Sequence, residues 1–316
     1  MSLLHQDSAE EIDDAARGES YTRGTSHVVV AGIVATLVVA IVVTVLLGGL
    51  LSVTLARLAP GFDADEAQLD PHLNSASVQA LRQARLDQHN IFRFYFHSLQ
   101  RAAHGNLGTS ISLGQPVSVL LRQRAPLTMR LVGIGLLLSW ALAMALALSA
   151  AWLRVSAYDT LTTVISGTFL CIPAGVLALL SVLWNVPGAL AIGLIVFPQV
   201  YRYARNLLAK SYALPHIITA RAKGLSQLRI LFWHVIPVAG PQLLAVAGVS
   251  VSLAVGAAIP VEALCGLAGV GQLAWQTALA RDLPLLTNLT ILVTLVTLLA
   301  NSGADVIGHM LQGQEA

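Results

Sequence analysis

Few residues of this chain combine a type and a spacing that could support catalysis. Glu262 is the one ionisable side chain at the end of an apolar run that invites a mechanistic role. An acid inside a membrane is functional by default, but at a helix end a carboxylate exposed at the interface explains it equally well. His89, His97 and His104 lack an acidic or cysteine partner, so we expect ordinary surface histidines and no metal site.

The sequence also lacks the common catalytic motifs. The segment around Lys223 reads ARAKGL, without the glycine spacing with which a P-loop cradles phosphates. It contains no HExxH motif, no GxSxG motif and no Cys/His cluster. Cys171 and Cys265 lie in apolar or Gly-rich surroundings, and we interpret both as small hydrophobic residues. We therefore expect no bound cofactor and no ATP hydrolysis by this chain itself.

A basic segment between two apolar, uncharged runs is the clearest candidate for a docking site. Residues 212–237 read YALPHIITARAKGLSQLRILFWHVIP. The segment contains three cations and no acid: Arg221, Lys223 and Arg229. Pro215 suits the first turn of a helix, Gly224 can adopt the left-handed conformation that ends one, and Ser226 can cap the next. The pattern predicts two short helices with a hinge, and Ile217 could present an apolar group beside the cation four residues later. A basic loop that only follows the positive-inside bias is the simpler alternative.

The elements that position these residues are those of an all-α integral membrane protein. Hydrophobic residues make up 56% of the chain and charged residues 11%, against roughly 25% charged residues in soluble domains. Long apolar runs must be helical, because lipid offers no partners to backbone groups. We expect six transmembrane helices, at residues 28–56, about 131–153, about 160–184, about 188–209, about 235–261 and about 283–304. Pro173 could kink the third span, and the turn residues 185–188 separate it from the fourth.

The charges outside these spans predict the topology. The loop from Tyr201 to His234 carries six Lys or Arg and no acid, so we expect it in the cytoplasm. With six spans, the polar tail 1–27 and residues 309–316 share that side. The polar insertion 57–124 then lies outside, since long loops translocate largely regardless of charge. Residues 125–308 form the expected core.

The basic segment resembles the cytoplasmic coupling loop of binding-protein-dependent ABC importer permeases. That loop reads EAA, three residues, Gly, nine residues, then I-x-L-P. Aligned on the glycine, the matching or near-matching positions are Ala220, Gly224, Ile236 and Pro237, and the departures are Ile218, Thr219 and His234. The variant TARAKGL at residues 219–225 is closer to the oligopeptide, dipeptide and nickel branch of the family.

Two further stretches resemble the same branch. Residues 105–110 with Pro116 and Val117 resemble its Gly-Asp-Leu-Gly-x-Ser and Pro-Val signature, with Asn106 in place of the Asp. Residues 261–285 resemble Val-Glu-x-x-Phe-x-x-Pro-Gly-x-Gly followed by Arg-Asp-x-Pro. The matches are Val261, Glu262, Gly269, Gly271, Arg281, Asp282 and Pro284, while Cys265 replaces the Phe and Ala268 the Pro.

The resemblance implies an ABC importer type I permease fold with a large external insertion between helices 1 and 2, in a bacterial or archaeal plasma membrane. Its implied partners are two ATP-binding cassette subunits that hold ATP and Mg, a second homologous permease and an extracytoplasmic substrate-binding protein. No nucleic acid is expected. In the coupling loop 212–234 and just after it, the implied site residues are Ala220 for close packing, Gly224 as hinge, Arg221 and Lys223 as polar rim, and Pro237. The implied external rim or gate residues are Glu262, Gly269, Gly271, Arg281 and Asp282.

Peptides are the expected solute, and two other functions stay open. A permease for nickel or another small solute would share the same motifs, and a metal-selective version could use the outer histidines. A channel or carrier that works without ATPases should function when purified alone. Proton-coupled carriers need ionisable groups near the bilayer midplane, and the middles of these apolar runs contain none.

Overall fold

The computed structural model describes residues 39–55, 58, 91–153 and 155–312 of the 316-residue chain. The chain divides into two compact units, residues 1–47 and 48–316, and each is considered by itself. The expected polar tail 1–27, the start of the first expected span and residues 59–90 of the expected insertion lie outside the described residues. The same holds for His89 and for residues 313–316.

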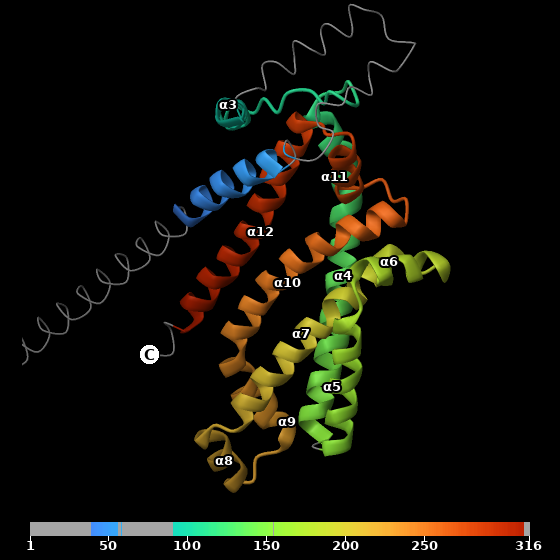
Figure 1. The fold of residues 1–316 in the computed structure, drawn as a ribbon. Helices are drawn as coiled ribbons and strands as arrows, with labels where there is room; N and C mark the ends of the chain where they lie inside the picture. Colours follow the sequence, from blue (N-terminus) through green and yellow to red (C-terminus); the bar gives the residue numbers. More distant parts are fainter. Residues whose placement is uncertain (1–38, 56–57, 59–90, 154, 313–316) are drawn as a thin grey trace, which may run out of the picture. The chain divides into compact units, whose positions relative to one another are not determined.

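The regular structure of the described residues is helical (Figure 1), apart from a single β-bridge between Thr109 and Pro116. The helices of the second unit are α3 (Ile91–Ala103), α4 (Val117–Leu153), α5 (Ser156–Cys171), α6 (Ala174–Leu183), α7 (Gly188–Tyr212), α8 (Pro215–Ala222), α9 (Gln227–Ile230), α10 (Ile236–Leu264), α11 (Val270–Leu279) and α12 (Leu283–Gln312). A π-helical turn, Leu231–Val235, joins α9 to α10. The described residues of the first unit lie in the apolar helix Val39–Leu55, which continues into the second unit.

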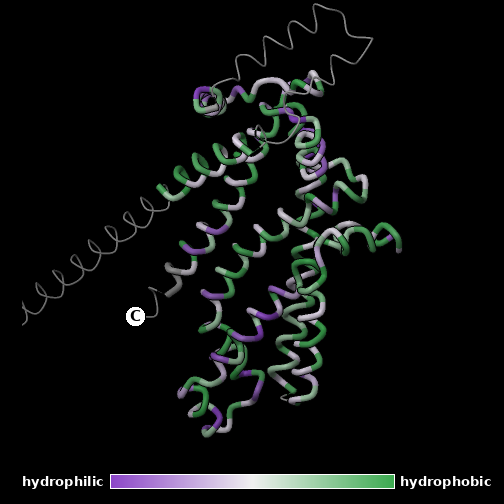
Figure 2. Tube along the Cα trace, viewed as in Figure 1, coloured by the Kyte–Doolittle hydropathy of each residue, from purple (hydrophilic) through white to green (hydrophobic). Residues whose placement is uncertain are grey.

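Three helical stretches of the described residues are long and apolar enough to cross a membrane. They are Val117–Leu153, Gln227–Leu264 and Leu283–Gly308, and a fourth is added if the bent pair α5 and α6 counts as one span. Figure 2 shows hydrophobic residues along most of these helices, and hydrophilic ones gathered at the end of α7 and around α8 and α9. An all-helical membrane fold is therefore confirmed, whereas six spans stay a prediction.

Helix α4 begins earlier than the sequence predicts. Residues 117–124 are expected in the external insertion, but α4 starts at Val117 and continues for 37 residues. Arg122, Arg124 and Arg130 lie in its first part, and these charges conceal the helix from a hydropathy pattern. Pro126 lies inside it.

The third expected span is two helices at a sharp angle. Helices α5 and α6 are separated by Ile172 and Pro173 and are bent by 94° relative to each other. A proline cannot donate a backbone hydrogen bond, and it disfavours helical conformation in the residue before it. The break therefore falls at the proline, but it is far sharper than a kink within one span.

Glycine and alanine allow the long helices to pack closely. A Cβ on Gly135 of α4 would lie 2.8 Å from Ile192 of α7, and one on Gly193 of α7 would lie 3.2 Å from the Gly135 carbonyl. On α10, a Cβ on Gly248 would lie 2.7 Å from the Ala304 side chain of α12. Small residues at such contacts let backbones approach in membrane proteins, where packing rather than hydrophobicity drives association. These pairs form the frame from which the loops extend.

Candidate functional site

The segment between α7 and α10 folds as two short helices around a glycine. Pro215 opens α8 in its first turn, and Gly224 has a φ of +76°, as the sequence predicts. The N–H groups of Gly224 and Leu225 donate to the carbonyls of Arg221 (2.9 Å) and Ala220 (3.3 Å), which closes the helix by the usual left-handed ending. A side chain other than glycine would be strained at that φ.

The predicted cap at Ser226 is only half right. Ser226 occupies the N-cap position of α9, but its side chain makes no capping hydrogen bond. Its carbonyl accepts the N–H of Ile230 at 3.0 Å. Helix α9 is only four residues long and runs directly into the π-helical turn. Its position is therefore fixed by its continuation into α10 and not by a side-chain cap.

One face of the loop is buried in the chain's own core. Ile217 is 0% exposed and Ala220 5% exposed, and both belong to the same apolar cluster as Val200 and Leu208 of α7 and Val235. Ile217 is therefore not presented beside Arg221, contrary to the sequence-based expectation. Ala220 does provide close packing, but here it packs within this chain. A helix of eight residues is too short for its sequence to say which face turns inward.

The opposite face of the loop is cationic and apolar. Lys223, Gly224 and Arg229 are exposed, as is Pro237 at the start of α10. Four large apolar side chains are also exposed: Ile218, Leu228, Phe232 and Trp233. From the sequence, these four residues are expected in the loop at 212–234, but they are not identified as part of a docking surface. We call these residues, with Lys223 and Arg229, the exposed loop face.

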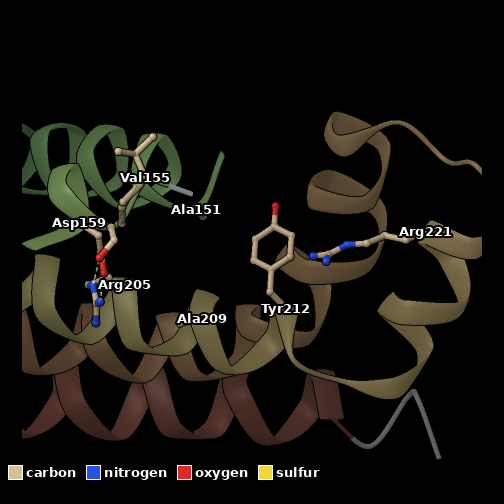
Figure 3. Close-up of a pocket in the computed structure, with 10 residues that line it drawn as sticks. Ala151, Val155, Asp159, Arg205, Ala209, Tyr212 and Arg221 are labelled. Atoms are coloured by element: carbon tan, nitrogen blue, oxygen red, sulfur yellow. Dashed lines mark hydrogen bonds and ion pairs between the residues drawn. The ribbon is translucent and has the colours of Figure 1, made fainter. Parts of the chain in front are cut away.

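Arg221 takes a different direction. Its guanidinium carbon lies 5.9 Å from the centre of the Tyr212 ring, and its side chain lines a cavity of about 340 Å³. Figure 3 shows Arg221 reaching from α8 toward that ring, with Asp159 and Arg205 on the other side of the cavity. Of the two cations expected at a polar rim, Lys223 is simply exposed, while Arg221 borders this cavity.

Asp159 and Arg205 join α5 to α7 by an ion pair that the sequence did not reveal. Arg205 Nε donates to Asp159 Oδ1 at 2.7 Å, and a second guanidinium nitrogen contacts Oδ2. Such a two-point contact is the strongest arrangement for an arginine and a carboxylate. From the sequence alone, Arg205 marks only the polar end of a span.

Glu262 holds the first turn of α11 at the other end of the fold. Its side chain is 0% exposed, so the alternative of an interface-exposed carboxylate is wrong. Glu262 Oε2 accepts the N–H of Gly271 at 2.7 Å and that of Gln272 at 3.3 Å. A carboxylate there satisfies free N–H groups and the positive end of the helix dipole.

Two glycines make room for this contact. A Cβ on Gly269 would overlap the Glu262 carboxylate, and one on Gly271 would lie 2.8 Å from the Ile259 Cα of α10. Helix α4 adds two bonds: Val270 N–H donates to Thr128 Oγ1 at 2.8 Å, and Arg124 donates to Gln272 Oε1 at 2.9 Å. The three helices α4, α10 and α11 are thus tied together around one buried acid.

Asp282 connects the two motif stretches that lie far apart in sequence. Its Oδ2 accepts the Ser110 hydroxyl at 2.5 Å, the Ser112 N–H at 2.9 Å and the Ser112 hydroxyl at 2.8 Å. Its Oδ1 accepts the Leu285 N–H at 3.1 Å, which caps α12. Arg281 before it has a φ of +52°. Asp282 is 2% exposed.

Glu262 and Asp282, two of the residues expected at the external rim, hold helix starts in position. Within the part of the chain that the structure describes, no three His, Cys, Asp or Glu side chains gather where they could hold a metal ion. His104 Nδ1, in the turn after α3, lies 2.7 Å from the Gln100 carbonyl of that helix. Glu262 and Asp282 each accept backbone N–H groups and fix a helix start.

Comparisons with known proteins agree with this arrangement. The family described as "Binding-protein-dependent transport system inner membrane component" matches residues 142–313. The oligopeptide transport system permease protein OppB of Salmonella typhimurium is 29% identical over 266 residues, which cover 77% of this chain and 85% of that protein. The oligopeptide transport system permease protein AppB of Bacillus subtilis is 25% identical over 299 residues, covering 84% and 93%.

A solved structure shares the fold. The inward-facing MetNI methionine ABC transporter contains a chain that superposes with a TM-score of 0.56 at 17% identity, over 61% of this chain and 97% of that one. The family match spans α5 to α12, including the two-helix loop between α7 and α10 and the residues Glu262 and Asp282. The chain therefore belongs to the binding-protein-dependent transport system inner membrane components, the permease subunits of ABC importers.

Proposed function

We propose that this chain is a six-span permease subunit of an ATP-driven importer of peptides. Two ATP-binding cassette subunits hold ATP and Mg and grip the loop at residues 212–234. A second homologous permease completes the pathway, and a substrate-binding protein delivers the solute from outside. Both termini lie in the cytoplasm. The choice of peptides is supported by relatives that are named oligopeptide permeases.

The observation that carries this proposal is the two-sided loop of α8 and α9. One side of the loop is the exposed loop face, which combines Lys223 and Arg229 with apolar groups such as Trp233. A mixed aromatic and cationic surface is typical of protein interfaces. Its inner side is anchored by Ile217 and Ala220 in the core. A force that an ATPase subunit applies to the exposed loop face would therefore be transmitted directly to α7 and α10.

The outer end complements this loop by staying fixed. Glu262, Gly269 and Gly271 lock α11 to α10, and Asp282 locks α12 to the loop at 105–112, with Arg281 just before it in the chain. In this proposal they form the external rim against which the helices open and close. No group among them has to react with the solute.

Replacement of Gly224 by Glu tests the proposal. Gly224 has open space around it and a positive φ, so the variant strains the hinge and adds a charge without disturbing the core. We expect the tagged variant to reach the membrane, to lose its ATPase subunits on co-purification and to lose uptake of labelled oligopeptides. Gly114→Glu is the matched control, because Gly114 also has open space and a φ of +62° but lies on the outer loop.

Normal uptake by Gly224→Glu would contradict the coupling role. Transport by the reconstituted chain without ATPases would favour a channel or carrier. Uptake of nickel rather than oligopeptides by the intact complex would keep the mechanism and change the solute.

A further inference from the structure

The cavity beside α8 has walls of two kinds. It lies where α4 ends, α5 begins and the last turns of α7 meet α8. The end of α4 lines it with three small apolar residues, Ala147, Ala150 and Ala151. Asp159 and Arg205 lie at one end of the cavity and Tyr212 and Arg221 at the other, with Ala209 of α7 between them (Figure 3). Its volume of about 340 Å³ can admit a group much larger than a water molecule.

The charges in this cavity do not cancel. Arg205 is neutralised by Asp159, with which it shares two contacts. Arg221 lies over the face of the Tyr212 ring, and among the described residues no carboxylate forms an ion pair with it. A guanidinium held over an aromatic ring keeps its N–H groups in a defined plane. The described lining therefore presents one uncompensated positive charge.

The cavity lies beside the ends of apolar helices. Helix α4 ends with Trp152 and Leu153, whose side chains are 57% and 55% exposed. The apolar half of α7 gives way to cations at Arg202 and Arg205. Tryptophan and arginine at helix ends are typical of the headgroup region. On the proposed topology, this is the cytoplasmic leaflet, whose anionic lipids attract basic groups.

We propose that this cavity binds the headgroup phosphate of an anionic phospholipid, with Arg221 as its hydrogen-bond donor. The planar fork of a guanidinium matches two phosphate oxygens. The alanine side admits the glycerol and the first carbons of an acyl chain, which a protein carboxylate or a free anion would leave uncovered. Because α4, α5, α7 and α8 all border the cavity, the bound lipid connects the two-helix loop to the helices that this loop moves. The inference rests on the proposed orientation and on no property of the ATPases.

Binding of defined lipids to the purified full-length chain tests this site. The chain in detergent is titrated with phosphatidylglycerol, with phosphatidylcholine as the zwitterionic comparison and inorganic phosphate as headgroup chemistry alone, and bound ligand is counted by native mass spectrometry. We expect phosphatidylglycerol to be preferred. Arg221→Gln should weaken its binding by about tenfold or more, because it removes the two-point, charge-assisted contact with the phosphate.

Two further variants separate charge from space and surface effects. Lys223→Gln removes an exposed cation of the same loop that does not line the cavity, so we expect a change of less than about threefold. Ala151→Leu leaves every charge in place and fills part of the apolar side, so it should also weaken phosphatidylglycerol binding. Size-exclusion profiles identify any variant that fails to fold.

The outcomes that would overturn the site are distinct. Equal losses in Arg221→Gln and Lys223→Gln would mean general surface attraction, and equal binding of phosphatidylcholine would remove the role of the charge. Inorganic phosphate that binds as tightly as the lipid would make the ligand a free anion. Unchanged phosphatidylglycerol binding by Arg221→Gln would exclude Arg221 as the donor to the phosphate. Since the titration contains no ATPase, it can fail while coupling through Gly224 stands.

Discussion

At the scale of single residues, the carboxylate of Glu262 explains two glycines of the outer motif. It fills the position where a Cβ on Gly269 would lie, and it accepts the N–H of Gly271. Gly269 has extended backbone with a φ of −104°, so its glycine is required by space rather than by conformation. The motif is thus a packing requirement around one buried acid.

Gly269→Ala should therefore destabilise the permease. The added methyl group overlaps the Glu262 carboxylate and must push it away from α11, and such overpacking costs about 1–3 kcal/mol. The thermal unfolding midpoint of the purified protein would measure the loss. Gly256→Ala is the control, because Gly256 lies in α10 with no atom within 4 Å of the added Cβ. A midpoint for Gly269→Ala equal to that of the control would refute the packing role.

The single side chain of Asp282 holds both the loop at 105–112 and the start of α12. Asp282→Ala removes the carboxylate that accepts hydrogen bonds from the buried Ser110 hydroxyl and from the Ser112 and Leu285 N–H groups. We expect a loss of about 2–4 kcal/mol, since each stranded polar group costs about 1–3 kcal/mol. Hydrogen exchange should accelerate in residues 107–116 and in the first turn of α12.

The comparison for this variant is Asp305→Ala, an exposed aspartate further along α12, which should leave exchange in residues 107–116 unchanged. If Asp282→Ala also leaves it unchanged, the two motif stretches are held together by other contacts. The Asn288 amide, which donates to the Leu107 carbonyl at 2.9 Å, would be the next to test.

At the scale of elements, the two-helix loop offers a different docking surface from the one that its cations alone suggest. Trp233 is 77% exposed and lies on the same loop as Phe232 and Leu228. We expect Trp233→Ala to weaken association with the ATPase subunits by about 2 kcal/mol, roughly 30-fold, as for a central aromatic residue of an interface. Quantitative co-purification over a dilution series would measure the change.

Trp184→Ala is matched to this variant, since Trp184 is 69% exposed but lies at the C-cap of α6. It should not alter association with the ATPases. Equal retention of the ATPases by both tryptophan variants would mean that Trp233 does not contribute to docking, which would then depend on the cations and Gly224.

Local rules explain which elements the sequence could predict. Pro215, Gly224 and Pro173 act through their own backbone chemistry, so the start of α8, its end and the break before α6 were predictable. The direction of Ile217 and Arg221 was not, because it depends on α7 and on Tyr212. Contacts such as Asp159 with Arg205 and Ser110 with Asp282 join residues 46 and 172 positions apart, and no local pattern encodes them.

At the scale of the whole molecule, the charge distribution matches one direction of insertion. The α7 to α10 connection carries the cations of the exposed loop face, and the motif loop at 105–116 contains no Lys or Arg. Short loops rich in Lys and Arg stay in the cytoplasm. A chain inserted this way has α8 and α9 inside and the Asp282 contacts outside, which the proposed import mechanism requires.

Single cysteines on the two sides test this orientation. In a background where Cys171 and Cys265 are replaced by Ser, we expect a membrane-impermeant maleimide to label Gln115→Cys in intact spheroplasts. Ser226→Cys should be labelled only after permeabilisation. Both positions are exposed, so a difference in labelling reports the side of the membrane and not burial. Labelling of Ser226→Cys alone in intact spheroplasts would invert the topology, and with it the leaflet that supplies a lipid to Arg221.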